Sequence, residues 1–151
     1  MSESSSPDTV RIGLLIDVPH WGPTIDDVLL ATFHMVEDEY RAEGLIDRPI
    51  EYVVRVVPGL PGGSFGVVRD AFHELVKEGC LVIYGPMITE NGTPLLPYVE
   101  RLAEVPLVSM AGTEAMLGEW VFALNNGSMA DEALVIASVM AAGIMIARWR
   151  I

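Results

Sequence analysis

The stretch CLVIYGPMITEN, residues 80–91, joins a continuous apolar run to a loop that begins with Gly85 and Pro86. A second apolar run, residues 105–108, ends in the same way at SMAGT, residues 109–113. Short apolar runs that stop at loops of small and hydroxyl-bearing residues are typical of buried parallel strands. In open α/β sheets, ligands bind outside the carboxyl ends of such strands. The pattern therefore predicts a small-molecule site at these two loops.

The rest of the chain alternates between strand and helix patterns. Strands are predicted at residues 10–17, 49–57, 80–84, 105–108 and 120–124. Helices are predicted at residues 24–43, 64–79, 91–103 and 130–142, with a short helical turn at 113–117. Regular alternation indicates right-handed βαβ units. The predicted fold class is α/β, a Rossmann-like three-layer α/β/α lobe with a parallel sheet.

Two finer expectations concern the first helix and the end of the chain. The spacing of the apolar residues predicts that one face of the first helix is buried, with Val28, Leu29, Thr32, Met35, Val36 and Tyr40 on it. The tail, residues 144–151, is expected to be either the start of a strand or a frayed end.

The composition disfavours nucleic acids and anionic membranes as binding partners. The chain has 151 residues, of which 51% are hydrophobic, so one domain with a core is expected. The formal net charge of -12 would repel a nucleic-acid backbone or an anionic membrane surface. The single cysteine, Cys80, opens an apolar strand and is interpreted as a packed thiol rather than a nucleophile.

Neither end of the chain carries a clear membrane or export signal. The uncharged stretch at residues 133–147 is shorter than the about 20 residues that span a bilayer. A buried helix is therefore favoured over a short transmembrane anchor. The Ser-rich head, residues 1–9, is expected to be disordered, and it has no basic or apolar region of a secretory signal. As written, the protein is expected to be cytoplasmic.

Common catalytic and metal-binding motifs are missing from the sequence. It contains no GxxxxGK[ST], GxGxxG or GxSxG motif, and its three histidines lack the spacing of metal ligands. We therefore assign no catalytic residue, no metal ligand and no cofactor, and we expect that the protein is not an enzyme. An enzyme of flavodoxin-like or response-regulator-like topology is the weaker alternative.

The loop of residues 85–91 leads into a helix N-terminus, where free N–H groups favour an anion such as a carboxylate. Thr89 is equally consistent with ligand binding and with helix capping, whereas capping is favoured for Asn91. Glu90 disfavours a highly charged anion. In the second loop, Gly112 lets a ligand approach the backbone and Thr113 supplies a hydroxyl group, although a tight turn also needs small residues there.

The loop after the first strand adds two candidates. Trp21 is consistent either with a pocket wall that stacks on a ligand or with an aromatic residue that covers the rim of the sheet. Asp17, at the end of the first strand, is interpreted as a residue that caps a loop in preference to a catalytic carboxylate.

Four segments together carry a family resemblance. VRIGLLID, YRAEGLIDRPIEYVVR, ELVKEGCLVIYGP and VPLVSMAGT follow one another in the order and spacing of the N-terminal lobe of type I periplasmic binding proteins. The chain most resembles the branched-chain amino-acid and amide-binding members of ABC transport systems, over about residues 10–128. The resemblance implies two Rossmann-like lobes with a ligand between them. It places ligand contacts at Thr89, Ala111 and Thr113, and at Thr24 with Trp21 as a nearby substitute.

The resemblance also implies a domain organisation. Residues 1–9 are the disordered head, residues 10–124 are the ligand-binding lobe, and residues 125–151 are the hinge and first helix of a second lobe. The sheet of that second lobe is missing, so a truncated chain is expected, whereas family members are usually periplasmic or extracellular.

The function implied is non-catalytic binding of an amino acid, an amide or a carboxylate, with an ABC-transporter permease as partner. The alternative is a cytoplasmic ligand-sensing or self-associating regulatory module, which forms homo-oligomers through its apolar last helix.

Overall fold

The computed structural model describes residues 9–18, 25–124 and 129–148. Its five strands form one sheet in the order β2-β1-β3-β4-β5, and every pair of neighbours is parallel. The strands are β1 (Val10–Ile16), β2 (Ile50–Val56), β3 (Val82–Tyr84), β4 (Leu107–Ser109) and β5 (Val121–Ala123). The prediction of a Rossmann-like α/β fold with a parallel sheet is confirmed.

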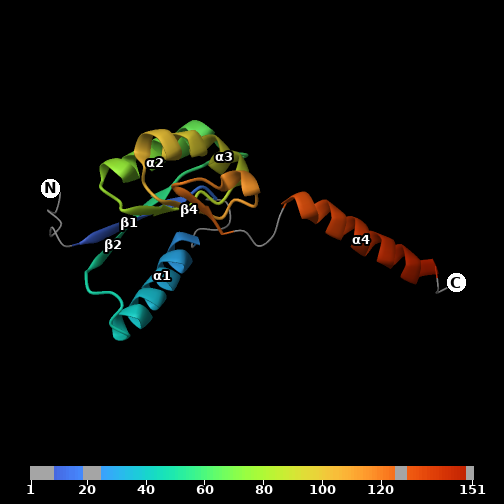
Figure 1. Ribbon diagram of the computed structural model, residues 1–151, viewed down its shortest axis with the longest axis horizontal. Coiled ribbons are helices and arrows are strands. Elements are labelled where there is room, and N and C mark those ends of the chain that lie inside the picture. The colour runs from blue at the N-terminus through green and yellow to red at the C-terminus, as the bar shows by residue number, and fades with distance from the viewer. Residues whose placement is uncertain (1–8, 19–24, 125–128, 149–151) are drawn as a thin grey trace.

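Helices cover the sheet in two further layers, as Figure 1 shows. They are α1 (Ile25–Ala42), α2 (Phe65–Lys77), α3 (Thr89–Tyr98) and α4 (Met129–Arg148). A π-helical turn, η2 (Val99–Ala103), continues α3, and a 3-10 turn, η3 (Glu114–Met116), lies between β4 and β5. Helix α1 lies on one face of the sheet, α2 and α3 lie on the other, and α4 extends away from this body.

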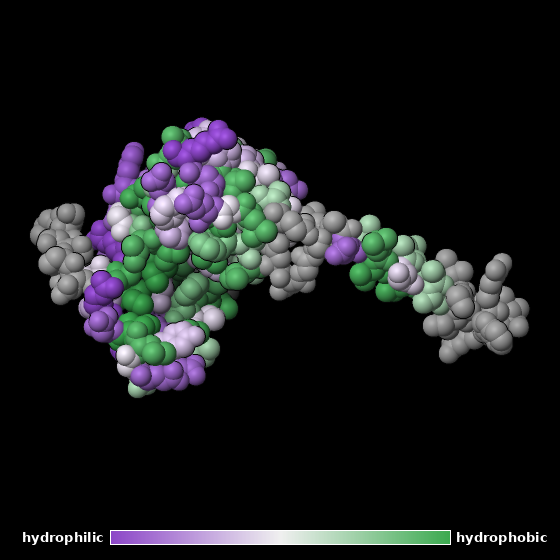
Figure 2. Space-filling model, in the orientation of Figure 1, coloured by the Kyte–Doolittle hydropathy of each residue, from purple (hydrophilic) through white to green (hydrophobic). Residues whose placement is uncertain are grey.

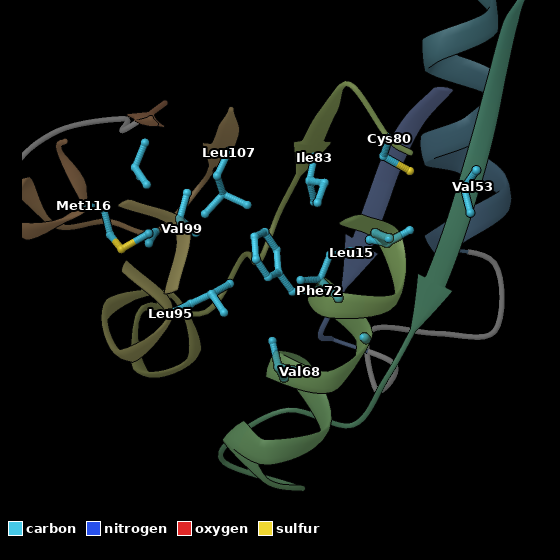
Figure 3. Close-up of a cluster of buried hydrophobic side chains, with 14 residues drawn as sticks. Leu15, Val53, Val68, Phe72, Cys80, Ile83, Leu95, Val99, Leu107 and Met116 are labelled. Carbon is cyan, nitrogen blue, oxygen red and sulfur yellow. The ribbon is translucent and has the colours of Figure 1, made fainter. Parts of the chain in front are cut away.

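The main core lies between the sheet and the layer of α2 and α3. Alternate residues of the strands point into it, and Phe72 of α2 sits among them without exposed surface (Figure 3). The α2 residues in this core recur at three- and four-residue intervals, as an amphipathic helix requires, and they are Val68, Ala71, Phe72 and Leu75. The core therefore follows directly from the apolar spacing in the sequence.

The buried face of α1 differs from the predicted one. Val28, Met35 and Tyr40 of the predicted face are 60%, 64% and 48% exposed, and only Leu29 of that face is half-buried as predicted. Phe33, which was not predicted, is half-buried against the sheet. The Phe33 ring lies 5.6 Å from the ring of Tyr52 and 5.3 Å from that of Tyr84. Because α1 has apolar side chains on two adjoining faces, spacing alone does not decide between them, and this aromatic contact does.

Two element boundaries also differ from the predictions. Helix α3 begins at Thr89, two residues earlier than expected, so Pro94 lies beyond its first turn. Helix α4 continues through Arg148, so the described part of the tail is neither a strand nor a frayed end. None of the described helices is both long enough and apolar enough to cross a membrane.

The edge strand β5 is held by a side chain from η2. Both carboxylate oxygens of Glu100 accept hydrogen bonds, from the backbone N–H groups of Glu119 at 3.0 Å and Trp120 at 2.9 Å. Strand β5 has only three residues and pairs with β4 alone. Glu100 therefore fixes the entry of the chain into the least supported strand of the sheet.

The position of Phe72 leads to a stability prediction. We expect Phe72→Ala to lower the free energy of unfolding by about 3–5 kcal/mol, because it leaves a cavity at the centre of the core. Val67→Ala, on the exposed side of the same helix, is the matched control and should change that free energy by only about 0.5 kcal/mol. Urea denaturation followed by circular dichroism measures both. Equal effects of the two substitutions would contradict this account of the core.

The Cys80 thiol leads to a pH prediction. Burial, and secondarily the charge of Glu78, raises its pKa from 9.0 to about 11. Between these values the folded chain retains a proton that the unfolded chain releases, so the free energy of unfolding should fall as the pH rises from about 9 to about 11. Urea denaturation across this range should show a flatter pH dependence for Cys80→Ala than for the unsubstituted chain. Identical slopes would argue against the buried thiol.

Candidate functional site

The strand order places a topological switch point between β1 and β3. The chain leaves β1 towards β2 with α1 on one face, and it leaves β3 towards β4 with α3 on the opposite face. The loops that follow these two strands therefore separate, and ligands of open α/β sheets bind in the crevice outside such a point. The candidate site lies at this carboxyl edge, where the loops after β1, β3 and β4 meet.

A buried carboxylate joins the loops after β1 and β3. Asp17 is only 2% exposed, and its Oδ1 accepts a hydrogen bond from the backbone N–H of Met87 at 2.8 Å. Its Oδ2 accepts from the N–H of Ile88 at 3.1 Å and from Nδ2 of Asn91 at 2.7 Å. The negative charge also faces the positive end of the α3 dipole. The capping role predicted for Asp17 is confirmed, and its carboxylate already occupies part of the predicted anion site.

Asn91 extends this network to the loop after β2. It has no exposed surface, and its Oδ1 accepts a hydrogen bond from the backbone N–H of Leu60 at 3.0 Å. Its Nδ2 also contacts the carbonyl oxygen of Leu60 at 3.3 Å. The capping role predicted for Asn91 is therefore wrong: its side chain makes no cap hydrogen bond to α3 and links three loops instead. The sequence marks residues 58–63 as a loop by their Pro and Gly content, but it gives no sign of this contact.

Ser109 joins the loops after β3 and β4. Its buried hydroxyl donates a hydrogen bond to the carbonyl oxygen of Pro86 at 2.9 Å and accepts one from the N–H of Ala111 at 3.1 Å. Gly85, at the start of the β3 loop, has a φ of +101°, and a Cβ there would lie 2.0 Å from the carbonyl oxygen of Leu15. Only glycine fits this close approach to β1. The edge is thus held rigidly by hydrogen bonds and tight packing.

Thr89 and Glu90 are the first two residues of α3. The side chain of Thr89 is half-buried and that of Glu90 is exposed. Their backbone N–H groups have no hydrogen-bond partner within the described part of the chain, in contrast to the neighbouring amides of Met87 and Ile88. These two amides and the Thr89 hydroxyl are the donors that α3 still presents to a ligand.

The residues predicted in the second loop divide between the core and the edge of the sheet. Ala111 has no exposed surface and belongs to the hydrophobic core. Gly112 and Thr113 are half-buried at the edge. The Thr113 hydroxyl accepts a hydrogen bond from the N–H of Ala115 at 3.2 Å, which caps η3. Among the described residues the Thr113 hydroxyl has no acceptor for its own hydrogen, so Gly112 and Thr113 are the predicted members of this loop that can offer atoms to a ligand.

Close packing brings the two loops together. A Cβ added at Gly92 of α3 would lie 3.1 Å from Cε of Met116 and 3.5 Å from Cβ of Ala111. The absence of a side chain at Gly92 therefore lets α3 approach η3 and the β4 loop. Trp21 and Thr24, the two candidates from the loop after β1, lie outside the described residues.

Within the described part of the chain, the edge carries acidic groups and no Lys or Arg. The described residues that follow the strands at this end are 17–18, 57–64, 85–88 and 110–113, and none of them is Lys or Arg. The arginines of the two longest strands are engaged with acidic side chains, Arg11 with Glu51 at 2.8 Å and Arg55 with Glu74 at 3.1 Å. A phosphate or a dianion would therefore find no opposite charge here.

A hollow lies at the opposite end of the strands. It encloses about 640 Å³ and is lined mainly by apolar residues, among them Cys80, Val105 and Trp120. Few polar groups converge there, whereas ligand sites combine an apolar wall with several placed polar groups. We therefore regard the carboxyl edge as the better candidate. Within residues 9–18, 25–124 and 129–148, no three His, Cys, Asp or Glu side chains cluster as a metal ion would need.

Comparison with known proteins leaves the family open: no protein-family model and no curated protein matches this chain.

The Asp17 network leads to a prediction about the edge. We expect Asp17→Ala to lower the free energy of unfolding by about 1–3 kcal/mol, because one buried and two partly buried N–H donors lose their acceptor. Asp38→Ala, an exposed acidic position on α1, is the control and should have little effect. Urea denaturation gives the free energies, and hydrogen exchange of Met87 and Ile88 reports the local change. Unchanged exchange at these two amides would show that Asp17 does not hold the loop.

Proposed function

We propose that this chain is a non-catalytic lobe that binds a small molecule, an amino acid, an amide or a carboxylate, at its carboxyl edge. The observation that carries the proposal is the tie between the β3 and β4 loops, made by the Ser109 hydrogen bond to Pro86 at 2.9 Å. It supports Thr89, Gly112 and Thr113 at neighbouring strand ends, as a ligand site in this fold requires. A rigid edge of this kind reduces the entropy cost of binding.

The chemistry of the edge favours a neutral or zwitterionic ligand within this class. The Asp17 carboxylate occupies the amides of Met87 and Ile88, so a ligand oxygen would bind to those of Thr89 and Glu90. The exposed carboxylate of Glu90 favours a ligand that also carries an ammonium or amide N–H group. Amino acids and small amides meet both conditions, whereas a simple carboxylate meets only the first.

The family that fits this proposal is the type I periplasmic binding proteins. The motif order in the sequence resembles their N-terminal lobe, and the strand order β2-β1-β3-β4-β5 supports a ligand crevice at the switch point. Under this proposal, the wider function is solute capture for an ABC-transporter permease. One open edge encloses a ligand on one side only, so we expect a weak affinity, on the order of millimolar, or about -4 kcal/mol.

A titration tests the site. We expect small amino acids or amides to shift the backbone resonances of Thr89, Gly112 and Thr113 in ¹⁵N-labelled protein. Thr89→Val removes a hydroxyl at the site and should weaken binding by about 5- to 20-fold, the effect of one lost hydrogen bond. Thr93→Val, one turn further along the exposed side of α3, is the matched control and should leave the affinity unchanged.

Two results would contradict the proposal. One is the absence of shifts at the edge with every amino acid, amide and carboxylate in the panel. The other is an equal loss of affinity in the Thr89 and Thr93 variants, which would place the ligand elsewhere.

A further inference from the structure

Helix α1 covers only part of its face of the sheet. Leu14 and Ile16, which point to this face from β1, have no exposed surface. The residues that point the same way near β4 and β5 remain in contact with water: Met110 is 40%, Phe122 52% and Leu124 57% exposed. Parallel sheets are normally covered on both faces. We call these three side chains the open sheet face.

Helix α4 is the second apolar surface without a partner. All of its residues from 131 to 142 are exposed, although the stretch carries only two charged residues, Asp131 and Glu132. The large apolar residues are between 58% and 68% exposed, and they are Leu134, Val135, Ile136, Val139 and Met140. In Figure 2 the described part of α4 is mostly green and pale green beyond the purple atoms at its start. A helix of this composition is normally buried.

We propose that the open sheet face is the docking site for α4 of a second copy of this chain, in a reciprocal two-fold dimer. Each copy offers one apolar helix and one uncovered sheet face, so an exchange of helices covers both surfaces of both copies. The open sheet face adjoins the ligand edge, because Met110 and Leu124 directly follow β4 and β5, but the proposal does not depend on the proposed function.

The distribution of apolar side chains on α4 favours docking onto a second copy of the chain over docking onto the sheet of the same chain. Leu134, Val135 and Ile136 follow one another at steps of about 100°, so they lie on three different sides of the helix. Docking on a single sheet buries one stripe and leaves the others in water. A two-fold dimer brings two α4 helices and two open sheet faces together, so that further sides can be covered. Residues 133–147 carry no charge, so this stretch of α4 brings none into the contact.

The area is sufficient for a stable dimer. If three side chains of α4 and three of the open sheet face each lose about 100 Å² of exposed surface, two reciprocal contacts bury roughly 1,200 Å². Stable protein interfaces begin at about this size, 1,200–2,000 Å² in total.

Sedimentation velocity of the full chain over a range of concentrations tests the dimer. We expect a monomer–dimer equilibrium whose dissociation constant rises at least about tenfold in Phe122→Asp and in Val139→Asp, because each places a charge in an apolar contact. Leu102→Asp, at a 70% exposed position on η2, is the matched control and should leave the equilibrium unchanged. All three positions are exposed in one copy, so circular dichroism should show that each variant keeps its fold.

Disulfide trapping separates exchange between copies from docking within one chain. In a Cys80→Ala background, an equal mixture of Phe122→Cys and Val139→Cys chains should form a mixed disulfide dimer. A monomer at every concentration, or a disulfide that forms only within a chain carrying both cysteines, would overturn the proposal. So would α4-dependent binding to phosphatidylcholine vesicles by a chain that does not dimerise.

Discussion

The carboxylate of Asp17 is the contact on which the arrangement of the carboxyl edge depends. Asp17 directly follows β1, and its carboxylate accepts hydrogen bonds from the amides of Met87 and Ile88, which lead into α3. It therefore fixes two loops that diverge to opposite faces of the sheet. Asn91 also binds Leu60 in the loop after β2, and the hydrogen bond from Ser109 to Pro86 connects the β3 loop to β4. Four strand ends are thereby held by three buried polar side chains, each with its hydrogen bonds satisfied. The same contact removes two of the donors that a ligand could otherwise use.

Most of the fold could be predicted from the sequence because apolar spacing and strand ends are local signals. Val68, Phe72 and Leu75 recur at helical intervals, and Gly44 and Gly79, which follow α1 and α2, have positive φ values as helix-ending glycines do. The predicted buried face of α1 was wrong except at Leu29, because the helix has two adjoining apolar faces. The choice between these faces depends on Tyr52 and Tyr84 of distant strands. Such a contact has no counterpart in local periodicity.

Part of the candidate site could likewise be predicted from the sequence, and part could not. Thr89, Gly112 and Thr113 could be proposed from sequence because they follow apolar runs, and the structure places them at one edge. The burial of Ala111 could not be foreseen, since it depends on the close approach of Gly92 and Met116. The role of Asn91 also depends on strand order: only when β1 and β3 are neighbours can one side chain reach Asp17 and Leu60 together.

The β5 edge of the sheet should open locally more easily than its centre. It pairs with one neighbour through three residues, and Phe122 has no cover, so opening this edge exposes far less apolar surface than opening the centre. Glu100 is the main polar restraint at its entry. A molecule that binds only the closed edge raises the cost of opening it by mass action. Amide hydrogens of β5 in a self-associating chain would therefore exchange more slowly as the protein becomes more concentrated, while those of β1 would keep a constant rate.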